Sequence, residues 1–229
     1  MSRNTPPLEV LYEDNHLIAV NKRPSDIVQG DKTGDTPLGE HVKAYIKDKY
    51  QKPGAVFLGV IHRLDRPVSG VVVFARTSKA LSRMNALFQK REVQKTYWAL
   101  VQHAPNASGK LVHFLRKNEA QNKSYASNKE AAGSKRAELS YRVRSHTDRY
   151  QLLEVLPHTG RHHQIRVQLA AMGCPIKGDV KYGFSRPNKD GSIHLHARKL
   201  EFVHPVSKEA ICLLANPPKD PVWDAVKGQ

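Results

Sequence analysis

Four short segments of the chain combine charged side chains with glycine or serine beside stretches of apolar residues. They are His62 to Asp65 with the following Ser69-Gly70, Lys95 to Tyr97, Gly160 to Arg166, and Gly178 to Gly183. In the first segment, Asp65 stands between the cations Arg63 and Arg66. Neighbouring cations favour the ionised form of a carboxylate, so Asp65 is a candidate nucleophile or general base. The alternative, which the spacing alone favours, is an ordinary turn aspartate that forms salt bridges with its neighbours.

The twelve histidines of the chain raise the question of a metal site. His162-His163 and His194-x-His196 are the densest groups, and alternate residues of a strand point to one face, so the second pair could supply two ligands. No Glu, Asp or Cys stands nearby as a third ligand. We therefore expect no metal, and we expect these histidines to make hydrogen bonds or to contact phosphate.

The elements that position these segments follow from apolar periodicity and turn residues. Residues 8–12 and 16–21 form a hairpin around Glu13-Asp14-Asn15, and residues 137–144 and 150–156 form a second hairpin. The other expected elements are a helix from Leu38 that stops before Pro53-Gly54, a strand at 70–76, a helix capped by Ser78, a strand at 96–101, a helix at 164–172 closed by Gly173, and strands at 194–203 and 210–215. Strands that pair locally, with few helices between them, predict an α+β fold with a mixed, largely antiparallel sheet and helices packed on it.

Length and composition fit one domain over residues 1–229. The chain is 39% hydrophobic and 25% charged, and no apolar run approaches the roughly 20 residues that span a bilayer. The N-terminus lacks the apolar core of a signal peptide, so we expect a cytoplasmic protein. Cys174 and Cys212 are too few for a disulfide framework, and we expect both to be buried thiols.

The charge balance is strongly basic. Lys and Arg number 37 against 21 Asp and Glu, which gives a net charge of +16 and favours a polyanionic partner over a basic enzyme that binds no nucleic acid. Residues 113–136 are basic and poor in apolar side chains. They predict an insertion or an edge hairpin that orders on a ligand, and the alternative is a solvated surface loop.

Several motifs together resemble a known family. HRLDRPVSGVVVFAR (62–76), KTYWALV (95–101), TGRHHQIRVQLAAMGCPIKGDVKYG (159–183) and the opening YEDNHLIAVNKRPSD (12–26) are similar, in order, to the motifs of the RluA-type family of RNA pseudouridine synthases. The resemblance runs from about Leu8 to about Pro217. Val68 and Gln168 depart from it, because the family usually has Thr and His at these positions.

The resemblance implies a pseudouridine synthase fold and a catalytic set of Asp65, Tyr97 and Arg166. It also implies substrate-binding residues, namely His62, Arg63, Arg161 and Ile165. Asp65 would attack the sugar or the base, or remove a sugar proton, and Arg166 would pair with it. Tyr97 would stack on the uracil, and Arg63 would fill the gap that the extruded base leaves.

The function implied is an isomerase that converts specific uridines of structured rRNA or tRNA to pseudouridine, without a metal or organic cofactor. We expect a monomer that captures RNA with the catalytic domain itself, because the N-terminal RNA-binding module of many relatives is absent from this sequence. The main alternative is a non-catalytic basic RNA-binding or assembly protein on the same scaffold. A metal-dependent nucleic-acid hydrolase would need a ligand cluster that the sequence lacks.

Overall fold

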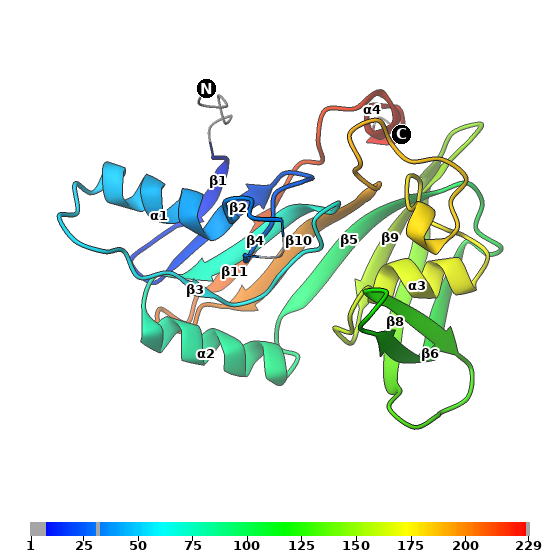
Figure 1. Ribbon diagram of the computed structural model, residues 1–229, viewed down its shortest axis with the longest axis horizontal. Coiled ribbons are helices and arrows are strands. Elements are labelled where there is room, and N and C mark those ends of the chain that lie inside the picture. Colours follow the sequence, from blue (N-terminus) through cyan, green and yellow to red (C-terminus); the bar gives the residue numbers. More distant parts are fainter. Residues whose placement is uncertain (1–7, 31–32, 228–229) are drawn as a thin grey trace. The chain divides into compact units, whose positions relative to one another are not determined.

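The computed structural model describes residues 8–30 and 33–227 (Figure 1). The chain divides into two compact units. The first unit runs to Val93 and includes Lys199–Asn216, and the second comprises Gln94–Arg198 and resumes at Pro217. Strand β10 (Leu195–Val203) contributes residues to both units.

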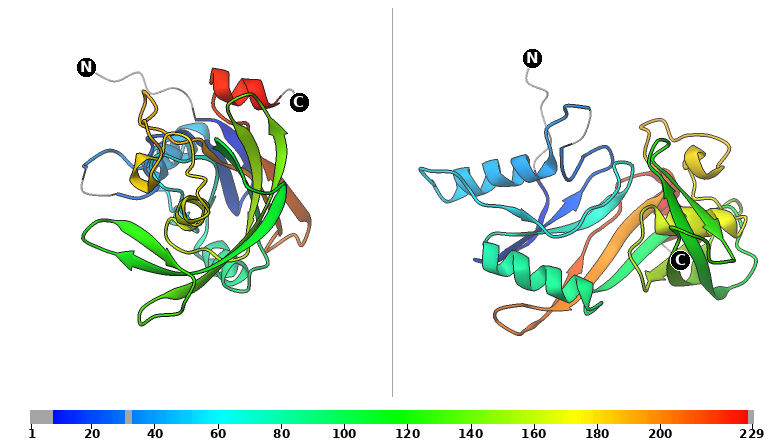
Figure 2. Two further views of the ribbon diagram at one scale, coloured as in Figure 1. Left: turned by 90° about the vertical axis from the view of Figure 1, so that its right-hand side faces the viewer. Right: turned by 60° about the horizontal axis from the view of Figure 1, so that its bottom comes forward.

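The first unit is a sheet with a helix on each face. Its strands are β1 (Val10–Glu13), β2 (Leu17–Lys22), β3 (Gly59–Val60), β4 (Ser69–Ala75), β10 and β11 (Ala210–Leu214), and its helices are α1 (Leu38–Lys49) and α2 (Ser78–Gln89). The strand order is β1-β2-β4-β10, with β3 beside β4 and β11 beside β10. Because side chains alternate across a strand, Phe74 lies on the α1 face while Val73 lies on the α2 face. The helices accordingly flank the strands (Figure 2).

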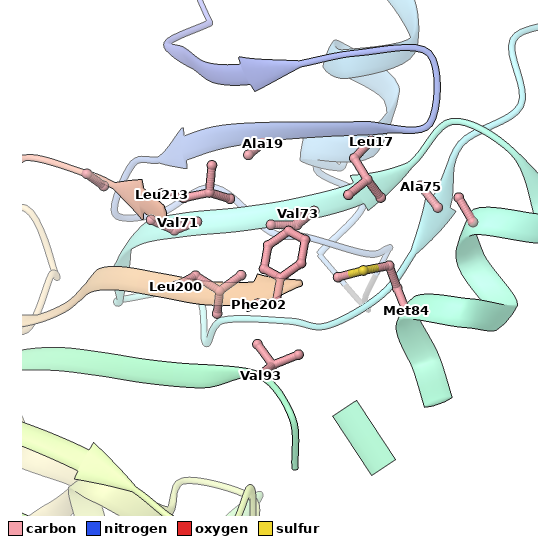
Figure 3. Close-up of a cluster of buried hydrophobic side chains, with 12 residues drawn as sticks. Leu17, Ala19, Val71, Val73, Ala75, Met84, Val93, Leu200, Phe202 and Leu213 are labelled. Atoms are coloured by element: carbon pink, nitrogen blue, oxygen red, sulfur yellow. The ribbon is translucent and has the colours of Figure 1, made fainter. Parts of the chain in front are cut away.

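The core on the α2 face is a continuous apolar cluster. Met84 reaches from α2 toward Phe202 of β10, and Leu17 and Val73 come from the central strands (Figure 3). Helix α2 begins after Thr77, whose Oγ1 accepts a hydrogen bond from Ala80 N at 3.1 Å. The expected cap, Ser78, is therefore one residue too late, because Thr77 is the residue that has the extended backbone of a cap.

The second unit is an antiparallel sheet with helices on its surface. Its strands are β5 (Gln94–Val101), β6 (Ser108–Asn118), β7 (Lys123–Ser127), β8 (Lys135–His146) and β9 (Gln151–Pro157), in the order β10-β5-β9-β8-β6-β7. Helix α3 (Gln164–Ala171), the 3-10 turn η1 (Val180–Tyr182) and α4 (Pro221–Lys227) complete it. Val167 of α3 packs on Ala137, and Trp223 of α4 packs on Leu100.

The basic stretch 113–136 contains a hairpin in the structure. Residues 114–118 of β6 pair antiparallel with residues 123–127 of β7 (Figure 2). Strand β7 is the last in the strand order of this sheet. A loop then leads to β8, which pairs with β6. The stretch is therefore built on paired strands.

The expected fold class is confirmed. Every strand pairing whose register is defined in the described residues is antiparallel, including β1 with β2 and β8 with β9. No helix in residues 8–30 or 33–227 combines the length and the apolarity needed to cross a membrane.

The expectation of two buried thiols is wrong for one of them. Cys174 is buried, but Cys212 is exposed, because it points away from the core on β11, beside the inward-facing Leu213.

Met84→Ala tests the α2 face of the core. Met84 is fully buried in the cluster of Figure 3, so the shorter side chain leaves a cavity. We expect the free energy of unfolding to fall by about 2–5 kcal/mol. Chemical denaturation measures the loss, and Lys79→Ala on the exposed side of α2 is the control, with an expected change within about 0.5 kcal/mol. A loss below that bound for Met84→Ala would contradict the packing described.

Candidate active site

Asp65 lies in a turn of the first unit that leads into β4. Its backbone carbonyl accepts a hydrogen bond from Val68 N at 3.0 Å, which closes the turn. Leu64 and Val68 on either side are buried at 8% and 2% exposure, while Asp65 itself is only half-buried. The two apolar neighbours thus fix the turn to the core and leave its carboxylate accessible. Asp65 thus lies in a turn, as the alternative interpretation of the sequence expected. A turn position is compatible both with a catalytic aspartate and with an ordinary surface aspartate.

Lys22 donates hydrogen bonds to this turn, and the sequence did not indicate this contact. It is fully buried at the end of β2, and its Nζ donates to the carbonyls of Arg23 at 2.9 Å, Arg66 at 3.1 Å and Val68 at 2.6 Å. Burial lowers the pKa of Lys22 to about 7, against the opposing influence of the Asp26 and Asp65 carboxylates. The only signal in the sequence was a lysine that ends an otherwise apolar strand.

Val68 stands where the family that the sequence resembles usually has threonine, and it contacts Lys22 through its backbone. Its side chain is buried, and its backbone carbonyl is the acceptor of the shortest Lys22 hydrogen bond, at 2.6 Å. A backbone carbonyl does not depend on the side chain that it accompanies. The hydroxyl of the usual threonine is therefore not needed for this contact.

The residues around Asp65 have partners within the first unit. Arg63 is exposed and donates from Nη1 to Gln29 Oε1 at 3.2 Å, so its guanidinium lies at the surface. Arg66 pairs with Asp35 at 2.7 Å. The Nε2 of His62 accepts a hydrogen bond from Val73 N at 3.1 Å, and its ring stacks on Phe88. His62 therefore supports β4 and α2, whereas Arg63 is placed where it can reach a ligand.

Tyr97 lies on β5 in the second unit, half-buried and opposite Val155 of β9. Val155 in turn lies opposite Tyr141 of β8, and Ala137 shares the Tyr141 face because alternate residues of a strand point the same way. Ala137 packs against Val167 of α3. Tyr97 and α3 therefore share one face of this sheet, and the neighbouring Trp98 lies on the other face with α4.

Arg166 lies in the first turn of α3 and is almost completely buried. Its Nε donates to Asp179 Oδ2 at 2.7 Å and its Nη2 donates to Asp179 Oδ1 at 2.8 Å, with the ring of Tyr182 at 5.1 Å. Asp179 belongs to the quoted motif Gly178 to Gly183, but the sequence did not show that it pairs with Arg166. The pairing of Arg166 with Asp65 stays a prediction, since Asp65 belongs to the first unit.

The other predicted binding residues surround the start of α3. Arg161 donates from Nε to the carbonyl of Arg136 at 3.1 Å, which joins it to the beginning of β8. Ile165 is only 7% exposed and belongs to the core of this unit. Gln168, in place of the usual histidine, is fully buried and donates from Nε2 to the carbonyls of Leu111 and Ala137.

The histidine groups make hydrogen bonds. His162 bonds Ser124 Oγ at 2.9 Å and stacks on His163, whose Nδ1 lies 2.9 Å from Tyr182 Oη. His194 bonds Asp220 at 3.2 Å. His196 is buried beside Trp223. The part of the chain that the structure describes contains no group of three His, Cys, Asp or Glu side chains that could hold a metal ion.

Comparisons with known proteins agree with one another. The family model described as RNA pseudouridylate synthase matches residues 16–171. The chain is 32% identical to a tRNA pseudouridine synthase C of Pasteurella multocida, with 91% of this chain and 90% of that protein covered. It is 34% identical to a ribosomal large subunit pseudouridine synthase C of Vibrio cholerae, with 88% of this chain and 63% of that protein covered. The solved structure of human RNA pseudouridylate synthase domain containing 4 matches with a TM-score of 0.78 at 26% identity, over 94% of this chain and 90% of that one.

The burial of Lys22 predicts a pH dependence of stability. Its pKa is about 7 in the folded chain and 10.5 when exposed, so the unfolded chain binds more protons between these values. Stability should therefore rise with pH in this window, by about 2 kcal/mol between pH 7 and pH 9 from this group alone. Urea denaturation at several pH values measures the slope, which should flatten in Lys22→Met.

The slope, and not the absolute stability, is the decisive quantity. Lys22→Met also removes one hydrogen-bond donor from each of the carbonyls of Arg23, Arg66 and Val68, which lowers stability at every pH. Lys52→Met removes an exposed ammonium and is the matched control, with an expected wild-type slope. A Lys22→Met chain whose stability still rises as in the wild type would contradict the assignment.

Proposed function

The chain belongs to the RNA pseudouridylate synthase family, a family of isomerases, and we propose that it converts specific uridines of structured transfer RNA to pseudouridine with Asp65, Tyr97 and Arg166. The observation that carries the proposal is the match over residues 16–171, which includes all three residues. Because Asp65 belongs to the first unit and the other two to the second, the proposal requires both units in one catalytic domain.

Transfer RNA is proposed first because of how the relatives match. Two relatives named tRNA pseudouridine synthase C align over 90% and 97% of their own length and a third over 60%, whereas ribosomal large subunit pseudouridine synthases C and D align over 63% and 70%. Ribosomal RNA is the second substrate to test.

We also propose a cytoplasmic location, where transfer RNA is used. We further propose that the monomer is active, because one chain carries Asp65, Tyr97 and Arg166.

The reaction breaks a carbon–nitrogen glycosidic bond and forms a carbon–carbon bond to the same base, with no net redox change. We propose that the target base first leaves the stack, at a cost of about a few kcal/mol. Arg63 is suited to fill the gap that remains, because its exposed guanidinium offers a flat surface to the neighbouring bases. The contact of Arg63 with Gln29 is a single hydrogen bond at the surface, which RNA could replace.

Asp65 then attacks the sugar or the base, or removes a sugar proton. Arg166 orients that carboxylate through its planar set of donors. Tyr97 offers a ring that stacks on the extruded uracil and a phenol that can move the proton at carbon 5. Its half-buried position on β5 supports this role, because a ring fully packed in the core could not meet a base.

RNA capture is proposed to depend on the basic hairpin of β6 and β7 with the loop that follows. Tyr125 is 46% exposed on β7, and Lys123 Nζ lies 5.6 Å from its ring. An exposed aromatic ring beside a cation is a surface that fits both a base and its phosphate. The cations of residues 113–136 are Arg116, Lys117, Lys123, Lys129, Lys135 and Arg136, the last two at the start of β8.

The first test is tritium release from RNA labelled at carbon 5 of uridine, because isomerisation frees that hydrogen without cutting the chain. Wild-type protein should release tritium from transfer RNA. Asp65→Asn keeps the shape of the side chain but removes its charge, so turnover should be abolished while RNA affinity stays within a few-fold. Asp35→Asn is the control for loss of a carboxylate in the same unit, and it should stay active.

Two results would count against the proposal. Asp65→Asn activity within about tenfold of wild type, a barrier change of only about 1.4 kcal/mol, would remove Asp65 from the mechanism. RNA binding without tritium release from transfer or ribosomal RNA would instead favour the non-catalytic RNA-binding protein.

The salt dependence of RNA binding tests the role of the hairpin. Changing Lys123, Lys129, Lys135 and Arg136 together to glutamine should reduce the slope of log K against log salt by about 3, because each phosphate contact contributes about 0.7 to 0.9. Glutamine at the exposed positions Lys47, Lys52, Lys79 and Lys90 is a control with the same change of net charge. If both variants keep the wild-type slope, the hairpin is a solvated surface element.

A further inference from the structure

The motif Gly178 to Gly183 has no role in the reaction described so far, yet its backbone is tightly constrained. Gly178 has φ +87°, and a Cβ there would lie 2.7 Å from Asn188 Nδ2 and 2.8 Å from the carbonyl oxygen of Ser192. Only glycine fits that conformation and that space. The carbonyl of the following Asp179 accepts hydrogen bonds from Tyr182 N at 3.0 Å and Phe184 N at 3.1 Å. The turn therefore fixes the position of Asp179.

The Asp179 carboxylate accepts two hydrogen bonds from one edge of the Arg166 guanidinium. Both oxygens take part, one on Nε and one on Nη2, and the two side chains are 1% and 6% exposed. A guanidinium that is buried without a counter-charge is strongly unfavourable, so Asp179 allows Arg166 to be charged inside the unit. The paired contact also fixes the plane of the guanidinium, which a single hydrogen bond would not do.

Tyr182 supports the same guanidinium from its flat side. The Arg166 Cζ lies 5.1 Å from the ring centre of Tyr182, and the Tyr182 hydroxyl accepts a hydrogen bond from Ser124 N at 2.9 Å. The same hydroxyl lies 2.9 Å from His163 Nδ1, at the start of α3. The ring is thus held by β7 and α3 at once.

We propose that Asp179 is a positioning residue, which holds the Arg166 guanidinium in the orientation that the isomerisation needs. The inference rests on the proposed function, because it assigns a purpose to Arg166. Asp179 takes two of the five N–H donors of Arg166 and leaves three for other acceptors.

The kinetic test compares Asp179→Asn with wild type on the same labelled transfer RNA. Asparagine keeps the shape but loses the charge and one acceptor, so the guanidinium is no longer held at two points. We expect kcat to fall about 10- to 100-fold, with KM within about threefold and the acidic limb of the pH profile unmoved. Asp190→Asn is the matched control, since Asp190 is exposed, accepts hydrogen bonds from Ser192 and does not contact Arg166, and it should keep wild-type kcat.

A double-mutant cycle separates positioning from mere support of the fold. Arg166→Lys keeps the charge but loses the planar donors, so it should lower kcat strongly in the wild-type background. In the Asp179→Asn background the same change should cost less than about threefold, because the orientation has already been lost. An undiminished cost of Arg166→Lys, or wild-type kcat in Asp179→Asn, would overturn the proposal.

A measurement on the protein without RNA decides the same question independently of activity. The Arg166 Nε–H should give a nitrogen-15 NMR signal that exchanges slowly with water in wild type and in Asp190→Asn. It should exchange fast in Asp179→Asn, and an unchanged exchange rate would overturn the proposal. If Asp179→Asn does not fold, Asp179→Glu keeps the charge, moves it by one methylene group, and should show the same two effects to a smaller degree. Wild-type protein that is inactive on all RNAs would count against the proposed function, while the exchange rate would still decide the role of Asp179.

Discussion

The cost of burying a positive charge governs how both candidate catalytic regions are built. Lys22 in the first unit and Arg166 in the second are both 5% exposed or less. Neither could remain charged there without acceptors placed around it. The turn that carries Asp65 supplies carbonyl acceptors to Lys22. The turn that begins at Gly178 supplies the Asp179 carboxylate to Arg166. The positions of these turns are therefore tied to the two cations.

The two cations are satisfied in different ways, with different electrostatic results. Lys22 bonds three neutral carbonyls, so its positive charge, when present, is not cancelled and acts on Asp65 nearby. Arg166 bonds a carboxylate, so its charge is largely cancelled within its own unit.

The sequence predicted the elements well where local patterns determine them. The hairpin of β1 and β2 follows from an aspartate turn, in which Asp14 Oδ1 accepts hydrogen bonds from His16 N and Leu17 N. The start of α2 was misplaced by one residue because Thr77 and Ser78 are both good caps and only the backbone decides between them. Cys212 was misjudged because alternation on an edge strand depends on which face is covered.

The candidate site was predictable only in part, because its supports are long-range contacts. Asp65, Tyr97 and Arg166 were found through motifs. Lys22 contacts a turn 44 and 46 residues away, and Asp179 pairs with a residue 13 positions back. Nothing in local spacing shows that a strand lysine will meet three carbonyls, or which of many aspartates will be buried beside an arginine. Such pairs become visible only when the chain is folded.

The buried amide of Gln168 gives α3 a contact with its sheet through a side chain that does not titrate. Its Nε2 reaches the carbonyls of Leu111 and Ala137 and also lies 3.1 Å from His113 Nδ1. An amide does not titrate, whereas a histidine side chain can take up a proton as the medium acidifies. Burial lowers the pKa of His113, which favours the neutral ring that can accept this hydrogen bond. The helix that carries Arg166 is therefore held to its sheet in part by an amide whose own charge does not change with pH.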